Sequence, residues 1–93
     1  LYLINNKKAI FKQNKKLFLR DIVKGESKNI DVINQYIESN DLTFGQLITF
    51  PTNNNILVSL GHYEQGGFFN LQHYLYNLKN QLLKKFKVNL KFS

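Results

Sequence analysis

The densest polar chemistry in the chain lies in a glycine-rich segment, Gly61 to Gly67, which contains His62 and Glu64. A histidine beside a carboxylate could act as a general base with an orienting partner. Alternatively, His62, Glu64 and His73 could be three metal ligands. The spacing matches no zinc motif, and the glycines form no phosphate-binding fingerprint. We therefore expect a protein that is not an enzyme and that uses no cofactor and no metal ion.

A second group of residues has the chemistry of nucleic-acid binding. Lysine and arginine side chains contact phosphates and displace counterions, and an aromatic ring stacks on an unpaired base. In residues 16–23, the alternation of side chains along a strand puts Leu17 and Leu19 on the core side. In residues 8–12, the same alternation puts Ala9 and Phe11 on the core side. The opposite, open face would then carry a set of cations with one ring: Lys8, Lys12, Lys16, Phe18, Arg20, Lys87 and Lys91.

The charge of +7 is unevenly distributed along the 93 residues. Residues 1–28 hold eight basic side chains and two acidic ones, for +6; residues 29–70 hold four acidic and no basic ones, for −4; residues 71–93 hold five lysines, for +5. This pattern predicts that the two ends of the chain meet and form one positive surface. The alternative is that the lysines have no binding role: they keep the surface soluble and prevent exposed strands from aggregating.

Protein–protein interaction is the alternative function. Tyr63, Phe68 and Phe69 beside the glycines would make an exposed aromatic anchor, unless the two phenylalanines are buried at the start of a following helix. A free edge strand would offer a partner a second place to bind. A helix-turn-helix over residues 29–50 is disfavoured, because that segment has no basic side chain with which to approach a polyanion.

Hydrophobic periodicity and turn residues divide the chain into short elements. Residues 42–50 fit a helix or a strand, and residues 61–67 read as a loop. The remaining predictions are strands over 1–4, 8–12, 16–23, 56–60 and 87–92 and a helix from about 30 to 39. An amphipathic helix is expected from Asn70 to Phe86, with an apolar stripe of Leu71, Leu75, Leu78, Leu82 and Phe86. Because its stripe is flanked by lysines, that last helix could also lie on an anionic membrane.

This order of elements predicts an α+β fold, with a single antiparallel or mixed sheet and two helices packed on one face. Residues 1–93 fit one small basic domain, and the lack of an initial methionine points to a fragment or processed part of a longer chain. The chain has no cysteine and no apolar run long enough to span a membrane. We expect a cytoplasmic binding module whose first partner is nucleic acid, preferably single-stranded.

Overall fold

Two antiparallel sheets and one helix make up the structure, a computed structural model that describes residues 2–50 and 54–86 and, for Phe69 and Phe86, the backbone only. The first sheet is a meander in the order β1-β2-β3-β4. Its strands are β1 (Tyr2–Leu3), β2 (Lys8–Gln13), β3 (Lys16–Asp21) and β4 (Glu26–Asn29). Asn14 and Lys15, both at positive φ, form the two-residue turn between β2 and β3.

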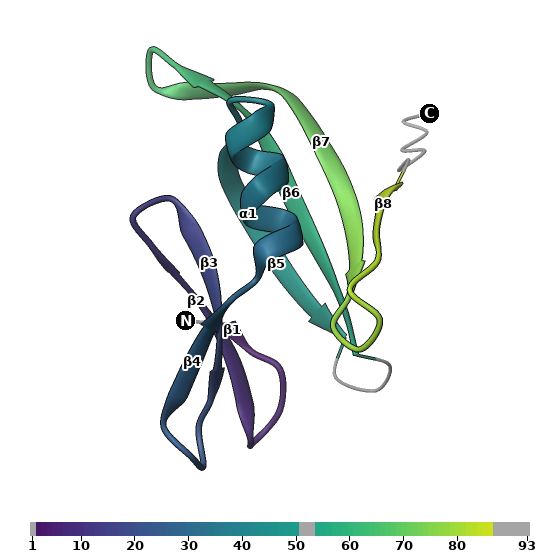
Figure 1. Ribbon diagram of the computed structural model, residues 1–93. Helices are drawn as coiled ribbons and strands as arrows, with labels where there is room; N and C mark the ends of the chain where they lie inside the picture. Colours follow the sequence, from purple (N-terminus) through teal and green to yellow (C-terminus); the bar gives the residue numbers. More distant parts are fainter. Residues whose placement is uncertain (1, 51–53, 87–93) are drawn as a thin grey trace, which may run out of the picture.

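A helix, α1 (Asp31–Ser39), follows β4 directly and leads to the second sheet. Its apolar face carries Ile33 and Ile37, which are buried against that sheet. The second sheet is also a meander, in the order β5-β6-β7-β8. Its strands are β5 (Thr43–Phe50), β6 (Asn55–Glu64), β7 (Gly67–Asn77) and β8 (Leu83–Phe86). Figure 1 shows α1 lying across one face of this sheet, with the first sheet beyond the start of the helix.

One hydrophobic core joins the three parts. The second sheet contributes Ile56, Val58 and Leu60, all fully buried, and the first sheet contributes Ile10 and Leu17. The two sheets also touch directly, because the Tyr2 ring meets the Phe44 ring edge-on at 5.9 Å and Thr49 Oγ1 donates a hydrogen bond of 3.0 Å to the carbonyl oxygen of Leu3. The first sheet is therefore fixed with one face toward the core and the other toward solvent.

The expected α+β fold with a single sheet and two helices is wrong. The described chain is mostly β, with two separate sheets and one short helix. The strands predicted over 1–4, 8–12, 16–23 and 56–60 and the helix near 30–39 correspond to β1, β2, β3, β6 and α1. Residues 42–50 form a strand, so the helix-turn-helix alternative is wrong as well. The strand expected over 87–92 lies outside the described residues.

The helix predicted from Asn70 to Phe86 is the largest error. Those residues form most of β7, a turn and β8, although their leucines have helical spacing. A period of two competes with that spacing, since Tyr74 and Tyr76 are 5% and 4% exposed and both lie in the core. Asn77 then ends the strand, because its side-chain oxygen accepts hydrogen bonds from the N–H groups of Lys79 and Asn80.

Candidate nucleic-acid interface

The register of the first sheet decides which of its side chains share a face. In an antiparallel pair, residues directly opposite each other point to the same side. Phe11 lies opposite Phe18, and Ile10 lies opposite Leu19. The inner face, toward the core, therefore holds Tyr2, Lys8, Ile10, Lys12, Leu17, Leu19, Asp21, Glu26 and Lys28, and the outer face holds Leu3, Ala9, Phe11, Gln13, Lys16, Phe18, Arg20, Ser27 and Asn29.

This register corrects the prediction of which β2 residues face the core. Ile10, expected on the open face, is fully buried in the core, and Phe11, expected in the core, stands on the outer face. Lys8 and Lys12 consequently point to the inner face, away from Lys16 and Arg20. The phase of β3 is confirmed, since Leu17 is buried and Leu19 packs against the core. The predicted cations of the first sheet are thus divided between its two faces.

Phe11 and Phe18 form a stacked ring pair on the outer face. Their ring centroids are 5.2 Å apart, and the ring planes make an angle of 14°. Both side chains are half-buried, so part of each ring is in contact with solvent. Of these two rings, only Phe18 was predicted to lie on the open face. A cross-strand count through the two-residue turn at Asn14 and Lys15 would have placed Phe11 beside it.

Two exposed cations flank this pair on the same strand. Lys16 and Arg20 stand two residues before and two residues after Phe18, about 7 Å along β3 in each direction. The Arg20 guanidinium donates a hydrogen bond of 3.3 Å to Ser27 Oγ, which holds it over the sheet. No acidic side chain belongs to the outer face of the described strands β1 to β4. The outer face is therefore a positively charged surface with two partly exposed rings at its centre.

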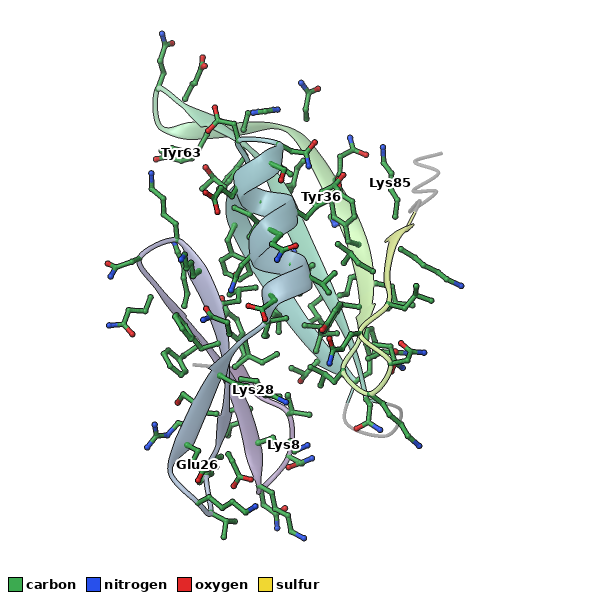
Figure 2. The ribbon with its side chains drawn as sticks, in the orientation of Figure 1. Lys8, Glu26, Lys28, Tyr36, Tyr63 and Lys85 are labelled. Carbon is green, nitrogen blue, oxygen red and sulfur yellow. The ribbon has the colours of Figure 1, made fainter. Side chains whose placement is uncertain are left out.

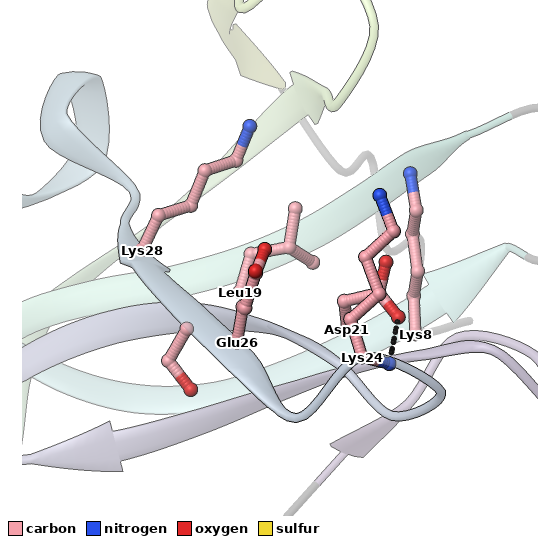
Figure 3. Close-up of a pocket in the computed structure, with 7 residues that line it drawn as sticks. Lys8, Leu19, Asp21, Lys24, Glu26 and Lys28 are labelled. Carbon is pink, nitrogen blue, oxygen red and sulfur yellow. Dashed lines mark hydrogen bonds between the residues drawn. The ribbon is translucent and has the colours of Figure 1, made fainter.

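The inner-face lysines have different surroundings. The Lys12 ammonium lies 5.9 Å from the centroid of the Phe44 ring, within range of a cation–π contact between the two sheets. Lys8 lines a pocket of about 220 Å³ at the other end of the sheet, drawn in Figure 3. Three lysines and two acids surround that pocket, whose lining is Lys8, Leu19, Asp21, Lys24, Glu26, Ser27 and Lys28.

The acids weaken this pocket as a phosphate site. The Asp21 carboxylate accepts a hydrogen bond of 3.0 Å from the N–H of Lys24, and this bond holds the pKa of Asp21 below its usual value. Asp21 is consequently ionised at neutral pH and stands among the lysines with Glu26. A polyanion meets less repulsion on the outer face than here. Lys87 and Lys91, the other two predicted contacts, lie outside the described residues.

The glycine-rich segment is a hairpin rather than a loop. β6 continues to Glu64, β7 begins at Gly67, and Gln65 and Gly66, both at positive φ, form a two-residue turn. Tyr63 and Phe68 lie opposite each other next to this turn, with ring centroids 5.1 Å apart in an edge-to-face arrangement. They are 53% and 41% exposed. Figure 2 shows Tyr63 near the projecting end of the hairpin, far from the first sheet's lower turn where Lys8 is labelled.

The two histidines lie apart in the second sheet. His73 lies opposite Ser59, whereas His62 lies opposite position 69, about 10 Å farther along the hairpin. In the described part of the chain, no three His, Asp or Glu side chains are arranged to hold a metal ion. Ser59 Oγ and His73 Nδ1 share a hydrogen bond of 2.7 Å, but Ser59 is 1% exposed and its hydroxyl is out of reach of a substrate.

No protein-family model matches this chain, and neither curated proteins nor solved structures give a match. Within residues 2–50 and 54–86, no helix has the length and apolar character needed to cross a lipid bilayer. The function of this protein has consequently to be inferred from the chemistry of the surfaces described above.

Proposed function

We propose that this protein binds single-stranded nucleic acid through the outer face of its first sheet and catalyses no reaction. The observation that carries this proposal is the stacked pair of Phe11 and Phe18, flanked by Lys16 and Arg20 on a face without an acid. Each ring offers an unpaired base a stacking surface worth about 1–3 kcal/mol, and the cations on either side reach the adjacent phosphates.

The geometry favours a strand of nucleic acid that runs along β3. Lys16, Phe18 and Arg20 stand on one line, and the two cations are separated by about 13 Å of extended chain. A duplex keeps its bases stacked inside, so the rings would be of no use to it, whereas a single strand turns its bases outward. Recognition through stacking and phosphate contacts tolerates many sequences.

Fluorescence anisotropy of a labelled oligothymidine of about ten nucleotides tests this proposal. With two phosphates neutralised, the plot of log K against log salt should have a slope near −1.4. The double variant Lys16→Glu, Arg20→Glu should lose at least about tenfold in affinity at ~50 mM salt. The matched control is Lys79→Glu, Lys84→Glu, which makes the same change in net charge at two exposed positions of the second-sheet region.

Two results would reject the proposal. One is the absence of any binding by the unmodified protein at ~50 mM salt, where phosphate contacts are strong. The other is an equal loss of affinity in both double variants, which would mean that only net charge matters. Circular dichroism of each variant checks that the sheets remain folded.

A protein partner at the β6–β7 hairpin is the second candidate function. It is favoured by the exposed ring pair of Tyr63 and Phe68 at the tip, since paired aromatic anchors are typical of interface hot spots. Phe69 was predicted as a third anchor, and its side chain is not among those described. Under this candidate, Tyr63→Ala and Phe68→Ala abolish the capture of a specific protein in a pull-down and leave oligonucleotide affinity unchanged.

A further inference from the structure

β4 is one of the two edge strands of the first sheet, because it pairs with β3 alone among the described strands; the other edge strand, β1, has only two residues. All four residues of β4, Glu26 to Asn29, are exposed. The strand contains no proline and no bulge, the usual devices that stop a second strand from pairing. In Figure 1, β4 runs from a turn at the end of the first sheet far from the second sheet up to the start of α1.

Backbone hydrogen bonds show which groups are available at this edge. The N–H of Ile30 donates to the carbonyl oxygen of Leu17 at 3.1 Å, so Ile30 turns its backbone toward β3. Alternate residues of an antiparallel strand bond to the same neighbour, so Lys28 and Glu26 also turn toward β3. Ser27 and Asn29 therefore direct their N–H and C=O groups to the open edge.

We propose that β4 pairs with β4 of a second copy of this chain, antiparallel and with Ser27 opposite Ser27. This register satisfies the outward N–H and C=O of Ser27 in both copies. It also places Glu26 of each copy opposite Lys28 of the other, so two pairs of opposite charge form on the inner face. The arrangement is a two-fold interface in which each copy presents the same surface.

The charges select this register over its neighbours. A shift of one hydrogen-bonded step in one direction places Lys28 opposite Lys28, and a shift in the other direction places Glu26 opposite Glu26. Like charges directly opposite each other destabilise a strand pair. Charged side chains on an edge ordinarily discourage strand pairing. Here the order of the two charges makes β4 complementary to β4 of a second copy in this one register. A four-residue edge is short, so the dimer is weak and reversible.

The pairing would extend the nucleic-acid surface, an extension that rests on the proposed function. Side chains paired across the two-fold axis stay on one side, so both copies of Phe11 and Phe18 would lie on the same face of an eight-stranded sheet. The Arg20–Ser27 hydrogen bonds of both copies would stand at the junction. Two such surfaces on one strand of nucleic acid bind more tightly than either alone.

Sedimentation of the protein without nucleic acid, from about 10 µM to 1 mM, tests the dimer separately from the function. Glu26→Lys and Lys28→Glu should each weaken it by about tenfold or more, because each change places like charges opposite each other. An equal mixture of these two variants should restore association, since each supplies the charges that the other lacks. The double variant Glu26→Lys, Lys28→Glu should dimerise as the unmodified protein does.

Thiol cross-linking tests the register, because the chain contains no native cysteine. In the proposed pairing, the Ser27 Cα atoms are about 5.5 Å apart, so Ser27→Cys should cross-link rapidly through a disulfide or a short thiol reagent. Asn29→Cys is the matched control, since its two copies would be separated by more than about 13 Å. A monomer at all concentrations, no rescue in the mixture, or equal cross-linking of both cysteine variants would overturn the proposal. None of these results bears on oligonucleotide binding by a single copy.

Discussion

The side chain of Asn34 forms hydrogen bonds with both backbone groups of Leu17. Its Oδ1 accepts from the Leu17 N–H at 2.8 Å, and its Nδ2 donates to the Leu17 carbonyl oxygen at 2.9 Å. The amide thus takes the place of a neighbouring strand beside β3 and fastens α1 to the first sheet. This contact fixes the sheet that carries the candidate interface to the rest of the core.

Asn34→Ala should destabilise the protein by about 1–3 kcal/mol, because the buried N–H of Leu17 loses its partner and the Leu17 carbonyl oxygen keeps only the hydrogen bond from the Ile30 N–H. Asn34→Asp should also destabilise, since a carboxylate accepts from the N–H but repels the carbonyl oxygen. Urea unfolding followed by circular dichroism measures both. Gln35→Ala, at an exposed position on the same helix, should change the free energy of unfolding by less than about 0.5 kcal/mol. Equal effects at both positions would contradict the role assigned to Asn34.

Alkaline pH should destabilise the contact between α1 and β7. Burial, followed by the hydrogen bond of 3.0 Å to the Tyr36 hydroxyl, raises the pKa of Tyr74 to about 12. The folded state holds the proton more tightly than the unfolded chain, so this contribution to stability is complete below pH ~10 and is lost as the pH rises toward about 12. Unfolding titrations over this range should show a fall in stability that is reduced in Tyr74→Phe. An unchanged pH profile in that variant would assign the effect to other groups.

Gly45 occupies a place in β5 where a side chain would be crowded. An added Cβ would lie 3.2 Å from both Ser59 O and Leu71 Cδ1, next to the irregularity between Phe44 and Gln46. The backbone oxygen cannot move without disturbing the β5–β6 pairing, so Gly45→Ala should destabilise by about 1–3 kcal/mol. Gly67→Ala is the control, because an added Cβ there meets nothing within 4 Å. A melting temperature equally unaffected in both variants would show that the β5 backbone adapts freely.

Removal of a ring from the outer face should weaken nucleic-acid binding without a loss of charge. Phe18→Leu keeps an apolar side chain on the sheet but removes the stacking surface, so oligonucleotide affinity should fall by about fivefold to 150-fold. The slope of affinity against salt should stay the same, because Lys16 and Arg20 remain. Phe44→Leu removes a ring from the inner side and should leave affinity unchanged. If Phe18→Leu binds as the unmodified protein does, stacking is not part of the interaction.

The sequence predicts three strands of the first sheet and α1 well because local signals agree there, but it does not predict β4, whose residues were expected to break the strand pattern before the helix. Paired asparagines mark turns, and Ile30, Ile33 and Ile37 have the spacing of one helix face. The helix prediction over residues 70–86 fails because the local signals conflict there. The leucines have helical spacing, whereas Tyr74 and Tyr76 alternate as in a strand. Pairing with β6 over β7 resolves that conflict, and such long-range pairing is not visible in the local pattern.

The candidate interface was only partly predictable. Lys16, Phe18 and Arg20 were correctly placed on one face, whereas Lys8 and Lys12 were assigned to it by an error of one residue in the phase of β2. A slip of one residue exchanges the two faces of a strand. Both Ile10 and Phe11 are apolar, so alternation could not decide between them. The burial of Ile10 beneath the second sheet decides it.

Nuclear magnetic resonance mapping of the isotope-labelled protein with oligothymidine tests the central claim most directly. We expect the ring signals of Phe11 and Phe18 and the side-chain signals of Lys16 and Arg20 to shift on binding. The signals of Lys8 and Lys12, on the opposite face, should not shift. Shifts centred on Lys8, Lys12 and the pocket beside Asp21, with the two rings unaffected, would contradict the assignment of the outer face. Shifts confined to Tyr63 and Phe68 would place binding at the hairpin instead.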